Sequence, residues 1–119
     1  MDSTFPETKL LTRLIAAAGL RSQVTSANIA NQNTPGYKRQ VVQFEGMLQE
    51  AMQRGGSAAE RLEPVVTEDT LTPARPDGNN VSLELEMNTA RENRILMETY
   101  LTILESHFNL LQAAITETR

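Results

Sequence analysis

The side chains with which this chain of 119 residues could perform acid–base or metal chemistry are few and scattered. His107 is the only histidine and cysteine is absent, so a transition-metal site would lack its usual nitrogen and sulfur ligands. Glu68 and Asp69 fall in a stretch without a rigid cleft, and Glu84 and Glu86 are better explained as partners of a helix dipole. No His–Asp pattern activates a serine or threonine. We therefore expect neither an enzyme nor a cofactor or metal site.

Composition and charge exclude several classes of protein. The net charge is -4, with 11 basic and 15 acidic residues, whereas a nucleic-acid binder needs a basic patch. Only 4% of the residues are aromatic, so Leu, Ile, Met and Ala must form the core. The longest apolar run, residues 14–20, is shorter than the roughly 20 residues of a membrane span. Asp2, Glu7 and Arg13 in and around the first apolar stretch argue against a cleaved signal peptide.

The elements that must position any site begin with a helix from about residue 5 to about residue 31. Thr4 and Glu7 match a capping box, and Pro6 suits a first helical turn. Apolar residues then recur every three or four positions, which predicts one apolar stripe. The stripe contains Leu10, Leu14, Ala17, Leu20, Val24 and Ala27. The small residues 16–19 would allow a second helix to approach closely.

The end of this helix is rich in asparagine. Asn31 and Asn33 favour a helix end, and Asn33 is a candidate for a left-handed cap. Residues 34–37, Thr-Pro-Gly-Tyr, fit a type II turn. Asn28 and Asn31 share a helix face, from which their amides could bond to backbone across a packed interface. The alternative is a solvated helix end followed by an ordinary turn.

The middle of the chain has weaker signals. Phe44, Met47, Leu48 and the following Ala51 or Met52 predict a short helix. Residues 53–79 contain a Gly-Gly pair and three prolines, and we expect them to be extended and mobile unless a partner orders them. The β-branched residues 65–67 could form a strand, but nothing obvious pairs with them.

The C-terminal segment predicts a long helix with Ser82 as its N-cap. A 4-3-4-3 spacing of the kind seen in a coiled-coil seam is interrupted only by Arg94. The seam consists of Leu83, Met87, Ala90, Arg94, Met97, Leu101, Leu104, Phe108, Leu111 and Ile115. Arg94 could extend its head to solvent, or it could set the register against a neighbouring helix.

These patterns predict an all-α fold in which two long terminal helices pack as a coiled-coil hairpin, with an extended or partly disordered middle. One domain would comprise an N-terminal helix (1–33), a turn with a short helix and flexible middle (34–80), and a C-terminal helix (81–119). A second apolar stripe on the last helix indicates a further partner, although a self-sufficient hairpin is the alternative. The packing residues expected are Leu10, Leu14, Ala17, Val24, Met97, Leu101, Leu104, Phe108, Leu111 and Ile115.

Two stretches resemble known proteins. Residues 27–31, Ala-Asn-Ile-Ala-Asn, and 34–38, Thr-Pro-Gly-Tyr-Lys, resemble the N-terminal signature of the bacterial flagellar rod, hook and hook-associated proteins. Residues 77–87 resemble the corresponding stretch of the short proximal-rod proteins of the FlgB type. Together the likeness covers about residues 8–45 and 77–116. The signature residues, with an assembly role implied, are Asn28, Ile29, Asn31, Thr34, Pro35, Gly36 and Tyr37.

The resemblance implies a structural subunit of the flagellar basal-body rod, located at its membrane-proximal end in the periplasmic space. It implies export from the cytoplasm through the flagellar type III apparatus without a cleaved signal peptide. The implied partners are other rod subunits, the adaptor FliE, and the MS ring and export gate. A soluble helical-hairpin adaptor and a short rod protein of the FlgC type are the alternatives, and residues 79–87 favour the FlgB type over the latter.

Overall fold

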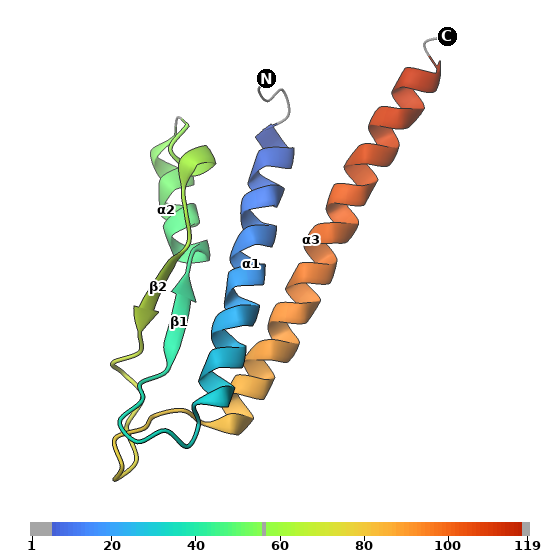
Figure 1. Ribbon diagram of the computed structural model, residues 1–119. Helices are drawn as coiled ribbons and strands as arrows, with labels where there is room; N and C mark the ends of the chain where they lie inside the picture. Colours follow the sequence, from blue (N-terminus) through green and yellow to red (C-terminus); the bar gives the residue numbers. More distant parts are fainter. Residues whose placement is uncertain (1–5, 56, 118–119) are drawn as a thin grey trace.

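The computed structural model describes residues 6–55 and 57–117, which form an elongated molecule of 68 × 28 × 20 Å (Figure 1). Its elements, in chain order, are α1 (Pro6–Ala30), β1 (Gln40–Gln43), α2 (Glu45–Arg54), a 3-10 turn η1 (Ala59–Arg61), β2 (Val65–Glu68) and α3 (Leu83–Glu117). The capping residue expected at Thr4 lies outside the described residues. No helix in the described part of the chain is long and apolar enough to cross a membrane.

The two long helices are confirmed, and so is the short helix between them. Ser82 caps α3 as predicted, because its backbone oxygen accepts from the Glu86 N–H at 2.9 Å and its hydroxyl accepts from the Leu85 N–H at 3.4 Å. The end of α1 and the start of α3 lie side by side, and α3 then extends past the start of α1 (Figure 1).

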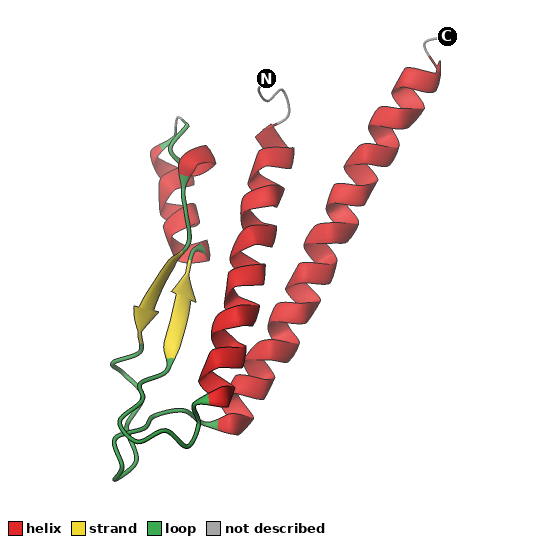
Figure 2. Cartoon of the chain, viewed as in Figure 1, coloured by secondary structure: helices red, strands yellow, loops and turns green. Residues whose placement is uncertain are grey.

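The all-α prediction is wrong in one respect, because a small antiparallel sheet is present (Figure 2). Residues 65–67, which seemed to have no partner, belong to β2 and pair with β1. The register places Gln40 opposite Glu68 and Gln43 opposite Val65. Within this ladder Val41 faces Thr67 and Val42 faces Val66, as suits β-branched side chains on a pleated surface.

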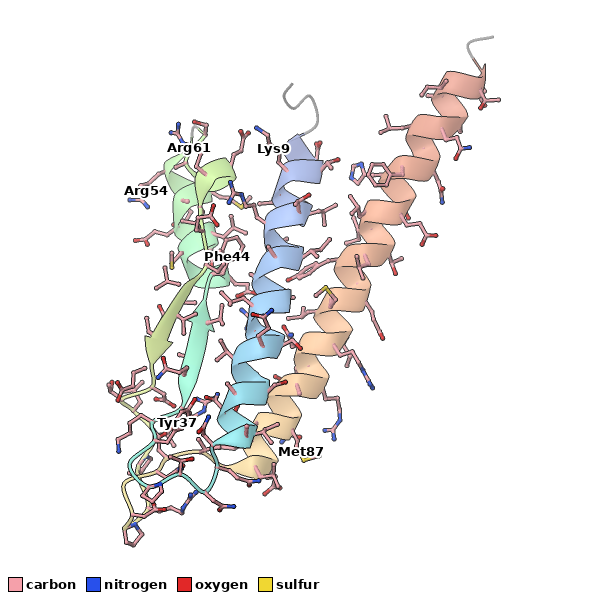
Figure 3. All side chains as sticks on the ribbon, viewed as in Figure 1. Lys9, Tyr37, Phe44, Arg54, Arg61 and Met87 are labelled. Carbon is pink, nitrogen blue, oxygen red and sulfur yellow. The ribbon has the colours of Figure 1, made fainter. Side chains whose placement is uncertain are left out.

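The small apolar core lies between α1 and the segment from β1 to η1. Ala17, Phe44 and Leu48 are buried together, and Leu10, Leu14, Ala59 and Leu62 pack around them. Phe44 lies on the α1 side of the chain that joins β1 to α2 (Figure 3). Helix α1 is thus the central layer, with α3 on its other side.

Much of the stretch 53–79, expected to be extended, has defined contacts with α1. The Nε of Arg13 donates to the Glu60 carbonyl at 3.1 Å, and its guanidinium lies 2.5 Å from a Glu63 carboxylate oxygen. These bonds hold the segment between α2 and β2 against the first half of α1.

Helix α3 keeps most of its apolar surface uncovered. Of its 35 residues, only Glu86 and Asn93 are buried. Met97, Leu104 and Leu111 of the predicted seam are half-buried. The exposed large apolar residues of α3 are Leu83, Leu85, Met87, Ile95, Leu96, Leu101, Ile103, Phe108, Leu110 and Ile115. The seam was expected to pack against the N-terminal helix of the same chain, but its residues Leu101, Phe108 and Ile115 are exposed. Packing along the whole seam therefore stays a prediction.

Candidate functional site

Seven polar side chains gather where the end of α1, the start of β1, the loop after β2 and the start of α3 meet. We call this cluster the polar junction. Figure 3 shows one member, Tyr37, at this end of the molecule. The polar junction consists of Asn28, Tyr37, Arg39, Asp69, Asn79, Asn80 and Glu86.

Asn28 is the centre of the polar junction on the α1 side. It is buried, and its amide makes four hydrogen bonds. Its Nδ2 donates to the Gln40 carbonyl at 2.9 Å and to Oε1 of Glu86 at 3.1 Å. Its Oδ1 accepts from the Gln40 N–H at 2.9 Å and from the Tyr37 hydroxyl at 3.1 Å. The predicted bond from this amide to backbone across a packed interface is confirmed, and the amide is saturated.

Two carboxylates share one guanidinium at the core of the polar junction. The Nε of Arg39 donates to Glu86 at 2.5 Å, and a terminal nitrogen of Arg39 donates to Asp69 at 2.7 Å. Glu86 is fully buried, so its negative charge must be compensated by the guanidinium of Arg39. Burial alone would lower the pKa of Arg39, but its hydrogen bonds to Glu86 and Asp69 together raise it.

Asp69 also organises the loop that follows β2. Hydrogen bonds from the Thr72 hydroxyl, from Arg39 and from the Leu71 N–H hold the pKa of Asp69 well below its usual range. The Thr72 hydroxyl donates at 2.6 Å and the Leu71 N–H donates at 2.8 Å. One carboxylate therefore fixes a loop and an ion pair at the same time.

Asn79 and Asn80 connect the start of α3 to the other segments. The Nδ2 of Asn79 donates to the carbonyls of Asn31 at 2.9 Å and Thr34 at 2.8 Å. The Oδ1 of Asn80 accepts from the Arg39 N–H at 2.6 Å, and its Nδ2 donates to the Asp69 carbonyl at 3.0 Å. Both side chains are buried, and each one satisfies backbone groups that are distant in the sequence.

The predicted type II turn at residues 34–37 is confirmed. Gly36 has a φ of 78°, and the Tyr37 N–H donates to the Thr34 carbonyl at 3.2 Å. The Gly36 N–H donates to the Asp77 carbonyl at 2.8 Å, which places this turn against the turn before α3. A Cβ atom at Gly78 would lie 3.2 Å from the Gly36 Cα atom, so the two turns meet through their glycines.

The left-handed cap expected at Asn33 is wrong, because no non-glycine residue of the described chain has a positive φ. The last turn of α1 tightens instead, with the Asn31 N–H bonded to the Asn28 carbonyl at 3.1 Å. Side chains from the segment before α3 satisfy backbone carbonyls that follow the helix. The Asn79 amide donates to the Asn31 carbonyl, and the Arg75 guanidinium donates to the Gln32 carbonyl at 2.6 Å.

The remaining signature residues lie around the polar junction rather than in it. Ile29 and Asn31 are half-buried, while Thr34 and Pro35 are exposed. The first-turn position expected for Glu86 is confirmed, but its burial beside Arg39 was missed. Glu86, Asn93 and Tyr100 recur at seven-residue intervals on α3 and therefore share one helix face. This spacing is the feature of the sequence that could have indicated the burial of Glu86.

A second polar contact, seven residues or two helical turns further along α3, also joins α3 to α1. The Nδ2 of Asn93 donates to the Ala18 carbonyl at 2.8 Å, and its Oδ1 accepts from Arg21 at 3.1 Å. Arg21 also lies 2.6 Å from a carboxylate oxygen of Glu45. Burial and the nearby Glu45 charge raise the pKa of Tyr100. Polar contacts at Glu86 and at Asn93 therefore fix the register of α3 against α1 at two positions along the helix.

The polar junction has a structural role, because its side chains hold separate segments of the chain together. Its carboxylates and amides are occupied by hydrogen bonds within the chain, which leaves no free base or nucleophile aimed at a cavity. Residues 6–55 and 57–117 contain no group of three or more His, Asp or Glu residues placed to hold a metal ion. The arrangement holds segments that are up to 58 residues apart in fixed relation.

Comparisons with known proteins agree on one family. Residues 14–38 match the family model described as flagella basal body rod protein. The flagellar basal body rod protein FlgB of Aeromonas hydrophila is 32% identical over 107 residues, which cover 80% of this chain and 81% of that protein. FlgB of Yersinia ruckeri is 31% identical over 71% of this chain and 74% of its own length. FlgB of Bacillus subtilis is 27% identical over 89% of this chain and 90% of its own length.

Proposed function

Since this chain belongs to the FlgB family of flagellar basal body rod proteins, we propose that its polar junction fixes the two terminal helices for assembly into the rod. The protein is a structural subunit of the flagellar basal body rod and not an enzyme. The polar junction is formed by the two stretches that carry the family resemblance, residues 27–38 and 77–87, together with Arg39 and the loop after β2.

One observation carries the proposal. The polar junction fastens the start of α3 to the end of α1, while most of the large apolar side chains of α3 stay exposed. A single chain has no other element in its described part to cover them, because α1 is already packed between α3 and the β1–β2 layer. An exposed apolar surface of this extent is typical of a protein–protein contact.

We place the subunit at the proximal, periplasmic end of the rod, after export from the cytoplasm through the type III apparatus without a cleaved signal peptide. Its neighbours would be other rod subunits, the adaptor FliE, and the MS ring and export gate. The resemblance of residues 77–87 to the short proximal-rod proteins supports this position. The predicted seam residues and the signature turn would then make the contacts between subunits.

Quantitative mass spectrometry of purified hook–basal bodies tests the proposal. We expect a few copies of this chain per particle, and we expect them to remain after the hook is removed. A chain that is absent from the particles and abundant in the cytosol would contradict the proposal and favour the soluble adaptor. Loss together with the hook would place the chain beyond the proximal rod.

A further inference from the structure

Leu71, in the loop after β2, presents an exposed apolar side chain from an anchored backbone. It is 92% exposed, more than any other large apolar residue of the described chain. A single exposed leucine needs no explanation by itself. This one differs because its N–H donates to Asp69, whose other oxygen bonds to Thr72 and Arg39. The buried polar junction therefore anchors the backbone at Leu71, so little backbone entropy would be lost when its side chain binds.

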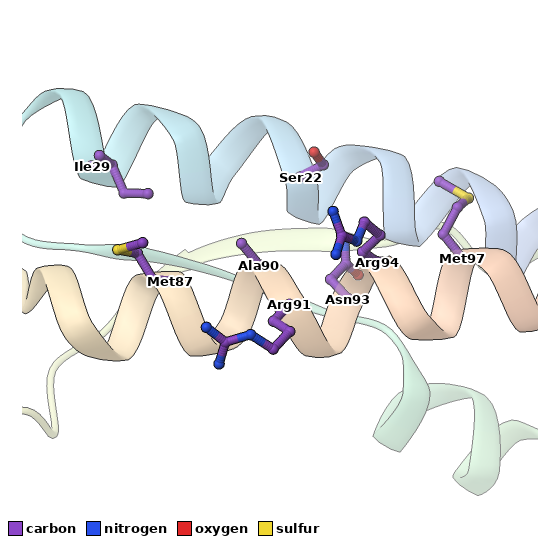
Figure 4. Close-up of a pocket in the computed structure, with 8 residues that line it drawn as sticks. All are labelled: Ser22, Ile29, Met87, Ala90, Arg91, Asn93, Arg94 and Met97. Atoms are coloured by element: carbon purple, nitrogen blue, oxygen red, sulfur yellow. The ribbon is translucent and has the colours of Figure 1, made fainter.

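The second surface is a groove between α1 and α3, which is hollowed, whereas Leu71 protrudes. Its volume is about 550 Å³. Figure 4 shows Ile29 on α1 above Met87 on α3, with Ala90 pointing into the space between the two helices. Arg91 and Arg94 of α3 also line it. Neither arginine forms an ion pair with another described residue, so the groove combines an apolar floor with free positive charge.

We propose that Leu71 of one copy docks into this α1–α3 groove of a second copy. The charges around the two surfaces are complementary. Glu68, three residues before Leu71, is exposed and forms no ion pair in the described part of the chain, whereas Arg91 and Arg94 border the groove. An apolar anchor with a charged rim is typical of a specific protein contact.

The placement of the two surfaces determines what this contact would build. The β1–β2 pair and its loop lie on the side of α1 away from α3, whereas the groove lies between α1 and α3 (Figure 1). The surfaces are different, so the contact is heterologous and each copy can engage two neighbours. Such a contact generates a ring or a helical array. The inference rests on the proposed function and identifies one contact by which rod subunits would join.

A charge exchange tests the contact in cells whose own copy of the protein is replaced by variants. We expect Glu68→Arg and Arg94→Glu each to lower the number of copies per basal body about tenfold, since like charges would then face each other. The double variant should recover most of the copies. Glu50→Arg, at an exposed position of α2, is the matched control and should be neutral.

Cysteine pairing tests which surfaces meet, and the chain has no cysteine of its own. Co-expression of Leu71→Cys with Ala90→Cys should give a disulfide-linked dimer in isolated basal bodies after mild oxidation. Leu71→Cys with Gln112→Cys should give none. A photo-reactive residue at position 71 that links to a different basal-body protein would overturn the second copy as the partner.

The outcomes separate this inference from the function on which it rests. Wild-type chain in the basal bodies, with no link between positions 71 and 90 and no effect of either charge reversal, would overturn the contact alone. Wild-type chain missing from the basal bodies would overturn the rod assignment itself.

Discussion

At the scale of single residues, Glu86 illustrates how the polar junction differs from polar side chains in contact with water. It is fully buried, and both of its oxygens accept hydrogen bonds, one from Asn28 and one from Arg39. Replacing it with glutamine keeps the shape but leaves the Arg39 charge with only one acidic partner. We expect Glu86→Gln to lower the free energy of unfolding by about 3 kcal/mol in urea titrations.

Glu84 provides the control for this measurement, since it is exposed in the same first turn of α3. Glu84→Gln should change the free energy of unfolding by less than about 0.5 kcal/mol. Equal effects of the two substitutions would show that helix-dipole interactions, rather than the buried ion pair, account for the role of Glu86.

Gly78 is required for a different reason, which is backbone geometry. Its φ is 88°, and an added Cβ would press on the Gly36 backbone at 3.2 Å. Gly78→Ala should therefore destabilise the fold by about 2 kcal/mol. Gly46→Ala, in α2 with open space around it, should stabilise the fold by about 0.5 kcal/mol. Thermal unfolding of the two variants should shift the midpoint in opposite directions, and shifts of the same sign would contradict this explanation.

The pH dependence of stability should follow Asp69. Its pKa in the folded chain is below the ordinary value of 3.8, so its contribution to stability is fully present above that value. The contribution is lost as the pH falls from about 4 through the folded pKa. We expect wild-type protein to lose more unfolding free energy than Asp69→Asn between pH 5 and pH 2. Parallel pH profiles of the two proteins would contradict the assigned role.

At the scale of elements, close packing of α1 depends on small side chains. Ala18 is fully buried and its carbonyl accepts from Asn93 of α3. Ala18→Leu should cost about 2 kcal/mol of unfolding free energy through overpacking. Ala16→Leu, two residues earlier at an exposed position, is the matched control and should be close to neutral in the same chemical denaturation. A neutral Ala18→Leu would mean that α3 does not pack against α1 in solution.

The elements differ in how far the sequence predicts them. Periodic apolar residues and local caps are enough for the helices, because their hydrogen bonds are local. A strand at residues 65–67 was considered, but β1 and the pairing of the two strands were missed. They pair across a helix and a 3-10 turn, and neither four-residue strand shows a clear alternation. The buried ion pair within the polar junction was missed for a similar reason. Arg39 and Glu86 are 47 residues apart, and each alone is indistinguishable from a surface charge.

At the scale of the whole molecule, the fold separates a closed end from an open one. The polar junction closes the end at which α1 finishes and α3 begins. The other end of α3 carries exposed Leu101, Phe108 and Ile115 from the predicted seam. This division suits a subunit that must keep its helices in register while its remaining apolar surface is covered by neighbours in the rod.

The amount of Phe108→Asp chain in purified basal bodies tests this account most directly, because Phe108 is 54% exposed on the open end of α3. We expect a variant that folds as the wild type does by circular dichroism and yet is lost from the particles. Asn109→Asp, its exposed neighbour, should be incorporated normally. Normal incorporation of Phe108→Asp would contradict the claim that this apolar surface of α3 is buried between subunits in the rod.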